Sequence, residues 1–193
     1  MATEGKHGVT ADTPKNILFG AGTIHKNLKY TTNSWNFAES IIGATNGGSK
    51  LSIVPEFTDV PVDGALVAVK GLKVKTGETA TMEINLAELT ADIIKAATVG
   101  KTGTSADTTY ELIESKSTID TGDYFENIAF VGLTLDGRKV IAILENVLCT
   151  SGFENEGKNK EGSVGKYTFT SHAELTSDLD TLPWKIYYPK ATA

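Results

Sequence analysis

The 193-residue chain has one cysteine, Cys149, three histidines and five prolines. A single cysteine excludes an intramolecular disulfide and any metal site built from several thiolates. The histidines His7, His25 and His172 lie far apart, and none has the paired spacing of a zinc motif. No apolar run is long enough to span a membrane, and residues 1–13 lack the apolar core of a secretory signal. We therefore expect a soluble chain, made in the cytoplasm, that holds no metal.

Catalytic motifs are also missing. Gly100-Lys101-Thr102 is similar to the end of a phosphate-binding loop, but Lys95 stands where that loop needs its first glycine. There is no GxSxG nucleophile elbow and no GxGxxG dinucleotide fingerprint. Asp178 and Asp180 lack the ligand pattern of a calcium loop. Cys149 follows an apolar run and is expected to be a small buried hydrophobe. We expect a non-enzymatic protein with no catalytic residue and no cofactor.

The charge balance is acidic, with a formal net charge of −6. This argues against a free-standing nucleic-acid binder, which needs a basic patch to displace counterions from phosphates. The 40% of hydrophobic residues is enough for a real core, and the length predicts a single domain over residues 1–193.

Residues 71–100 carry the clearest local pattern. Leu72 and Val74 alternate with lysines, Thr76-Gly77-Glu78 is typical of a turn, and residues 79–86 alternate again between apolar and polar. The pattern predicts a hairpin. A helix over residues 91–98 follows, with Thr90 as its N-cap, Gly100 as its end, and an apolar stripe that packs on the sheet: Ile93, Ile94 and Ala97.

The strongest strand signal is the pair 125–135 and 139–149 around Asp136-Gly137-Arg138, because Asp-Gly between two apolar runs favours a tight hairpin. Both faces of this hairpin carry apolar residues. Either both are covered within the domain, or one meets a neighbouring subunit.

Further strands are predicted along the rest of the chain. Residues 15–20 and 24–30 are expected to form two strands around a turn at 21–23. A strand at 50–58 contains Pro55, which indicates the edge of a sheet. The remaining predicted strands are 65–70, 110–114, 164–175 and 184–188. Eight to ten strands and one helix predict a mainly β fold, a β-sandwich or barrel with the helix packed on it.

Three segments lack a clean period: an N-terminal arm over residues 1–14, a long loop or arm over residues 31–50 with a Gly-rich breaker at 46–49, and a charged loop over residues 152–165. The 31–50 segment holds apolar residues that either fold back over the core or dock on another subunit.

Residues 46–97, NGGSKLSIVPEFTDVPVDGALVAVKGLKVKTGETATMEINLAELTADIIKAA, resemble the major tail protein, or tail tube protein, of long-tailed bacteriophages and prophages of Gram-positive hosts. LSIVPEF, VDGA at 62–65 and GETATMEINLAEL carry the resemblance, and KNILFGAGTI near the N-terminus is similar in layout. It covers about a quarter of the chain.

The resemblance implies a β-sandwich flanked by a helix, six copies of which form a ring, with stacked rings making a hollow tube. Phage DNA passes through the lumen without specific binding. The implied partners are further copies of the chain, a tape-measure protein and tail terminator and tip proteins, and the implied location is the virion tail, assembled in the host cytoplasm. An inner tube of a contractile tail or bacteriocin is a related alternative.

Two residue sets follow from these interpretations. Candidate inter-subunit contacts are Trp35, Phe37, Ile41, Ile42, Phe153, Glu154 and Lys158; candidate lumen-facing or subunit-facing strand positions are Lys73, Lys75, Glu83 and Asn85. A different class, a carbohydrate-binding or adhesion module, would use an aromatic platform of Trp35, Trp184, Tyr187 and Tyr188.

Overall fold

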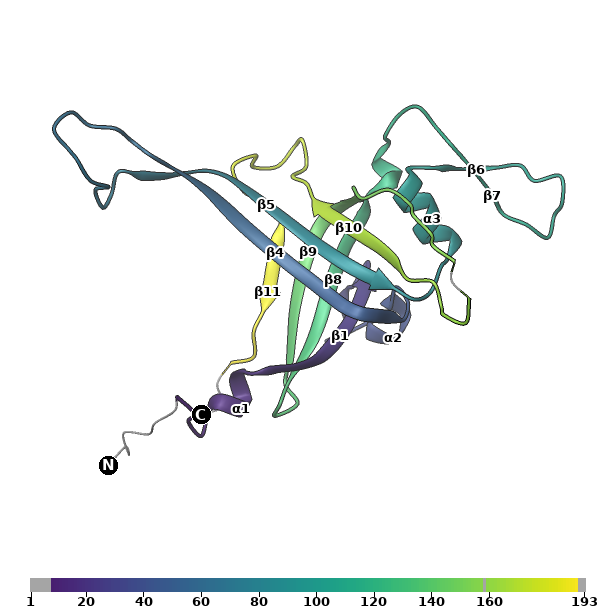
Figure 1. The fold of residues 1–193 in the computed structure, drawn as a ribbon, viewed down its shortest axis with the longest axis horizontal. Helices are drawn as coiled ribbons and strands as arrows, with labels where there is room; N and C mark the ends of the chain where they lie inside the picture. The colour runs from purple at the N-terminus through teal and green to yellow at the C-terminus, as the bar shows by residue number, and fades with distance from the viewer. Residues whose placement is uncertain (1–7, 158, 191–193) are drawn as a thin grey trace.

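The computed structural model describes residues 8–157 and 159–190. It is built mainly of antiparallel strands, which confirms the mainly β class (Figure 1). The elements in chain order are α1 (Thr13–Asn16), β1 (Leu18–Lys26), β2 (Tyr30–Thr31), β3 (Ser34–Trp35), α2 (Phe37–Ser40), β4 (Thr45–Asp59), β5 (Lys73–Leu86), α3 (Ala91–Thr98), β6 (Lys101–Gly103), β7 (Leu112–Glu114), the 3-10 turn η1 (Thr121–Asp123), β8 (Phe125–Thr134), β9 (Lys139–Cys149), β10 (Gly165–Ser171) and β11 (Trp184–Tyr187).

The main sheet has the order β1-β8-β9-β10-β5-β4, with β11 also paired to β9. β9 changes its partner along its length: residues 141–144 pair with β11, and residues 147–149 pair with β10. Asn146, with a left-handed φ of 50°, stands at the step between the two pairings. The sheet therefore bends there, and β4, β5 and β10 run diagonally across β8, β9 and β11 (Figure 1).

The core contains side chains from both halves of the bent sheet. Its fully buried members include Met82 and Ile84 of β5, Phe169 of β10, and Ile128 and Leu144 of the β8–β9 hairpin. The alternation predicted for residues 79–86 is present, because the apolar positions of that stretch point into this core. Each such side chain contributes about 1.5–3 kcal/mol by leaving water.

The predicted helix is confirmed as α3. The Thr90 side chain accepts a hydrogen bond from the Ile93 amide, and Ile93, Ala96 and Ala97 are buried in the core. Val99, not Gly100, takes the left-handed conformation at the helix end, with φ 48°. Gly100 is required for a different reason, because there is no room for a side chain: a Cβ at this position would lie 2.8 Å from Ile113 Cγ2.

The predicted β8–β9 hairpin is also confirmed, and both of its faces are covered in part by its own chain. One face joins the main core. The other carries a second cluster, Leu28, Ala129, Val131, Ile141 and Ile143, on which Trp35 and Phe37 pack. The 31–40 part of the irregular segment thus folds back over the sheet.

The hairpin predicted within residues 72–86 is wrong, because Lys73–Leu86 form one continuous strand. Thr76-Gly77-Glu78 does not turn: Gly77 pairs with Glu56, and a register shift between Glu56 and Phe57 absorbs the irregularity as a bulge. The chain reverses instead over residues 60–72, where a strand had been predicted at 65–70. Gly64 and Gly71 there adopt positive φ, and Pro61 withholds a backbone donor.

Two further predicted breaks lie inside strands. The turn predicted at 21–23 is a register shift within β1, where a Cβ on Gly22 would lie 2.4 Å from Phe130 Cε2. The flexible breaker predicted at 46–49 is a bulge within β4, where the Asn85 side-chain amide donates to the carbonyls of Gly47 (3.1 Å) and Gly48 (3.2 Å). Glycine signals a bulge as readily as a turn, which explains both errors.

Candidate assembly surfaces

The outer halves of β4 and β5 form a two-stranded ribbon over residues 54–79, closed by a tip loop over residues 60–72. β10 pairs with β5 only along residues 81–86, so each ribbon strand has the other as its only strand partner. Figure 1 shows the ribbon projecting well away from the rest of the molecule. The ribbon therefore receives little support from the core.

Apolar side chains of the ribbon stand in water. Leu66 is 98% exposed and Val67 78%, and the other large exposed apolar members are Val54, Phe57, Val60, Val62, Val69 and Val74. Ion pairs line the strands, Lys73 with Asp59 at 3.0 Å and Lys75 with Glu78 at 3.1 Å. Pairs of this exposed kind contribute about 0–1 kcal/mol. A two-stranded hairpin alone is marginally stable, so an apolar ribbon of this length is typical of a contact surface.

The ribbon is joined to the body by one specific bond. The indole Nε1–H of Trp184, at the start of β11, donates to Glu78 Oε2 at 3.1 Å. This bond, followed in strength by the one from Lys75, lowers the pKa of the Glu78 carboxyl. Beyond it, Ala80 is fully buried. The base of the ribbon therefore lies between Glu78 and Ala80.

Free sheet edges are a second surface. β4 hydrogen-bonds only to β5, and its 15 residues leave one long edge without a strand partner. Pro55 lies in this edge strand, as its missing donor predicted. β1, whose only strand partner in the main sheet is β8, is the other end of the sheet, and residues 41–42 cover part of its outer edge through a bridge at His25. Unpaired edges are templates for pairing with another chain.

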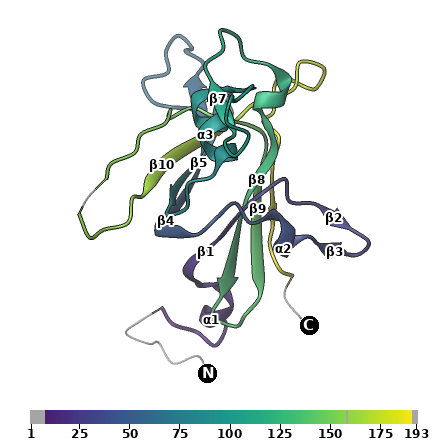
Figure 2. The ribbon, with the colours of Figure 1, turned by 90° about the vertical axis from the view of Figure 1, so that its right-hand side faces the viewer.

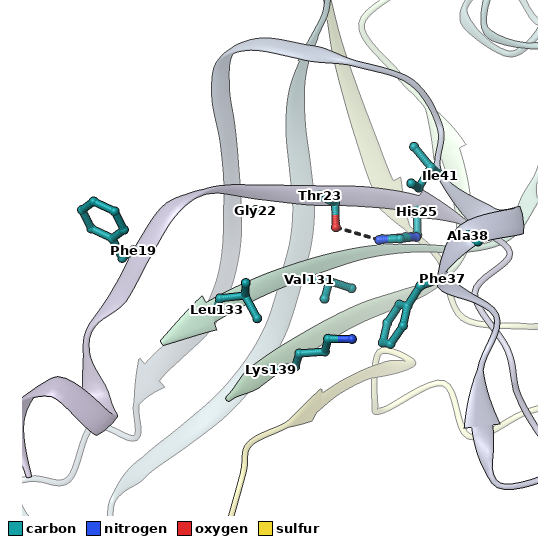
Figure 3. A pocket seen from close by; sticks show the side chains of 10 residues that line it. All are labelled: Phe19, Gly22, Thr23, His25, Phe37, Ala38, Ile41, Val131, Leu133 and Lys139. Carbon is teal, nitrogen blue, oxygen red and sulfur yellow. Dashed lines mark hydrogen bonds between the residues drawn. The ribbon is translucent and has the colours of Figure 1, made fainter. Parts of the chain in front are cut away.

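A groove on the outer face of the β8–β9 hairpin is the third surface. It lies between β1 and α2 and has a volume of about 550 Å³. Figure 3 shows Val131, Leu133 and Lys139 on the sheet below it, and Ile41 and Ala38 at the α2 end. Its lining is mainly apolar.

His25 lies beside this groove and is 1% exposed. Ser40 Oγ donates to the Asn36 carbonyl, so it accepts from His25 Nδ1 at 2.9 Å, and His25 Nε2 then accepts from Thr23 Oγ1 at 2.8 Å. Burial lowers the pKa of His25 below its ordinary value of 6.5, which the backbone oxygen of Phe37 opposes and the Lys139 cation reinforces. The imidazole is neutral at pH 7 and ties α2 to β1.

Lys139 supplies the positive charge of the groove. Its Nζ lies 4.1 Å from the centre of the Phe37 ring, a cation–π contact. Across residues 8–157 and 159–190, no carboxylate pairs with it.

The candidate inter-subunit residues are spread over several environments. Trp35 and Phe37 stack at 6.3 Å over the second cluster, and Ile41, half exposed, lines the groove. Ile42 is buried in the main core, so it is not available at the surface. Phe153 and Glu154 lie in the exposed loop as predicted, and Lys158 lies outside the described residues. Only Ile41 and Phe37 are brought together at one groove.

The four candidate strand positions all have partners within the chain. Lys73 and Lys75 belong to the ribbon ion pairs, and Glu83 pairs with Lys50 at 3.2 Å. Asn85 holds the β4 bulge through the bonds already described. The sequence pattern does not predict the tip loop, because the valines within it are typical of a strand. The surrounding Pro61, Gly64 and Gly71 are the residues that indicate a loop there.

The proposed aromatic platform does not form as one surface. Trp35 and Tyr187 meet edge to face at 5.1 Å, whereas Trp184 bonds to Glu78 and the Tyr188 hydroxyl donates to Asn16. Edge-to-face rings do not present the common plane on which a sugar stacks.

The described parts of the chain contain no group of three or more His, Cys, Asp or Glu placed to hold a metal ion. None of their helices has the length and apolar character needed to cross a membrane. Cys149 is buried, and burial raises the pKa of its thiol, as expected of a packing residue.

No family model and no curated protein matches the sequence. Among solved structures, the chain is similar to one described as the virion of a native gene transfer agent (GTA) particle. The TM-score is 0.42 and the identity 12%, over 80% of this chain and 92% of that chain. A similarity at this level does not establish a family, a partner or an activity.

Proposed function

We propose that the chain is a structural virion protein, the subunit of a phage tail tube, which assembles into hexameric rings that stack into a hollow tube for DNA. The observation that carries the proposal is the ribbon: residues 54–79 extend apolar side chains into water on two strands that no third strand supports. In a monomer this apolar surface is exposed to water, which is unfavourable in free energy. Assembly of several copies would cover it.

The free edges support the same proposal. In a closed ring, the edge of one subunit meets the edge of the next, so every long edge acquires a partner. β4 and β1 are the two end strands of the main sheet, and the outer edge of β4 in particular is open to a strand of a neighbouring copy. The resemblance of residues 46–97 to tail tube proteins covers β4, the ribbon and α3.

The charge and the loops fit a tube. A net charge of −6 disfavours adhesion of DNA to the lumen. Residues 8–14 of the N-terminal arm and residues 152–157 of the charged loop are largely exposed, so they can contact neighbouring copies in the proposed tube. Tape-measure, terminator and tip proteins would then be partners, and the virion tail the location. An inner tube of a contractile tail or bacteriocin shares this architecture, and a neighbouring sheath gene would distinguish it.

Negative-stain electron microscopy of the purified full chain at increasing concentration tests the proposal. Rings or tubes of uniform width are expected. A protein that stays monomeric at every concentration and salt condition would contradict it. A glycan array tests the adhesion alternative, for which the edge-to-face aromatic rings are unfavourable.

A further inference from the structure

We infer that the tip loop of one copy docks in the groove of a second copy, with its aliphatic side chains on the groove lining and Asp63 beside Lys139. The inference rests on the proposed self-assembly and names the two surfaces that make one of its contacts. Each surface is incomplete in the single chain.

The apolar character of the two surfaces matches. The groove lining includes three exposed or half-exposed large side chains, Phe19, Ile41 and Leu133. The tip loop presents Leu66 and Val67, which have almost no contact with their own chain. A groove of about 550 Å³ falls within the range of about 300–1,000 Å³ that pockets for small molecules occupy, which is room for a few aliphatic side chains. Docking would remove the apolar side chains of the groove and those of the tip loop from water at the same time.

The charges are complementary as well. Lys139 is held over the Phe37 ring and has no carboxylate partner in the described chain. Asp63, in the tip loop next to Gly64, likewise has no ion pair among the residues described. An Asp63–Lys139 pair would satisfy both charges and set the orientation of the loop in the groove.

The occupant must come from another copy. The ribbon projects away from the body and leads its tip away from β1 and α2, so the chain cannot fill its own groove (Figures 1 and 2). Because tip and groove are different surfaces, the contact is heterologous. Each docked pair leaves one free tip and one free groove, which allows addition of further copies.

Complementation between two variants tests this geometry by sedimentation velocity. Leu66→Asp inactivates the tip, and Leu133→Glu inactivates the groove. Each variant alone should remain monomeric where the wild type assembles, and an equimolar mixture should form one-to-one dimers and nothing larger. Such a dimer has one intact tip–groove contact and no intact tip or groove to extend it, and we expect sheet edges to pair only between copies that this contact already holds together.

Matched controls separate docking from general effects of charge. Leu175→Asp places the same change on an equally exposed leucine in another loop, and Leu135→Glu places it beside the groove but outside its lining. Both should assemble as the wild type does. Circular dichroism and thermal unfolding of every variant establish that the monomer is folded.

The outcomes distinguish this inference from the proposed function. If the wild type assembles and Leu66→Asp assembles equally well, the tip does not dock and the inference is wrong, although self-assembly stands. The inference is also wrong if the mixture stays monomeric, which would mean that tip and groove contact other segments. If the wild type never associates, both fail.

A charge exchange gives a second, independent readout. Asp63→Lys or Lys139→Glu alone should raise the critical concentration for assembly about fivefold, the upper range for an exposed ion pair. The double exchange should return it close to the wild-type value. If the increase in critical concentration of the double variant equals the product of the two single increases, the two residues are not coupled. That result would contradict a direct Asp63–Lys139 pair.

Discussion

The two halves of β5 share one strand and one ladder with β4, yet they lie in opposite environments. Residues 81–86 have a second neighbour in β10 and point Met82 and Ile84 into the core. Residues 73–79 pair with β4 only, and Val74 is half exposed. The strand therefore continues beyond the part that the core buries. We expect the inner half to carry the stability of the monomer and, in the proposed assembly, the outer half to meet another copy.

A matched pair of truncations on β5 gives the largest expected effect. Met82→Ala should lower the free energy of unfolding by about 2–5 kcal/mol, because it leaves a cavity in the core. Val74→Ala should lower it by less than about 1 kcal/mol, because little burial is lost. Urea denaturation of the monomer measures both, and equal losses would mean that the two halves do not differ.

The free energy of unfolding should also depend on pH through a residue of the body, His25, which lies outside the ribbon. His25 has a lowered pKa when folded, so the unfolded chain binds its proton first as pH falls. Its contribution to stability is therefore complete above pH 6.5 and is lost progressively below it. Urea denaturation from pH 7.5 to 5 should show this decline.

His25→Gln is the control, because a neutral amide cannot take up the proton. Its stability is lower at pH 7 but should change less between pH 7.5 and 5. His7 and His172 are retained in both proteins, so the difference isolates His25. Parallel pH profiles for the two proteins would exclude His25 as the titrating group.

The junction between body and ribbon predicts a smaller effect. Trp184→Phe removes the indole donor to Glu78 while keeping an aromatic ring, and should cost about 1 kcal/mol. Since the bond lowers the pKa of Glu78, the difference between the proteins should shrink as pH falls and that carboxyl is protonated, because a neutral carboxyl accepts the indole N–H more weakly than a carboxylate does. Denaturation at pH 7 and pH 3 checks this, and a constant difference would indicate packing alone.

Much of the body could be predicted from the sequence, because alternation and caps act locally. Residues 79–86, the β8–β9 hairpin and α3 each follow from such signals. The ribbon could not, since Gly77 allows both a turn and a bulge, and only pairing with the distant β4 decides between them. The groove depends on β1, α2 and β8–β9 meeting in space. Two residues of the groove lining, Phe37 and Ile41, are among the predicted inter-subunit contacts, but the sequence does not predict the groove.

Removing the ribbon should have the smallest effect on the monomer. Glu56 and Gly77 are directly paired, so an Asn-Gly turn can join them in place of residues 57–76. The shortened monomer should keep its unfolding free energy within about 1 kcal/mol, because few buried contacts are lost. Assembly should be abolished. A shortened chain that unfolds in water would show that the ribbon is part of the folding unit.

Hydrogen exchange read by mass spectrometry tests the central claim most directly, because it compares the two halves of β5 in one experiment. In the monomer, amides of residues 80–86 should exchange slowly and those of residues 60–79 quickly. In assembled protein, the slow half should be unchanged and residues 60–79 should become protected. Ribbon amides that exchange equally fast in monomer and assembly would contradict the claim that the ribbon is an assembly surface.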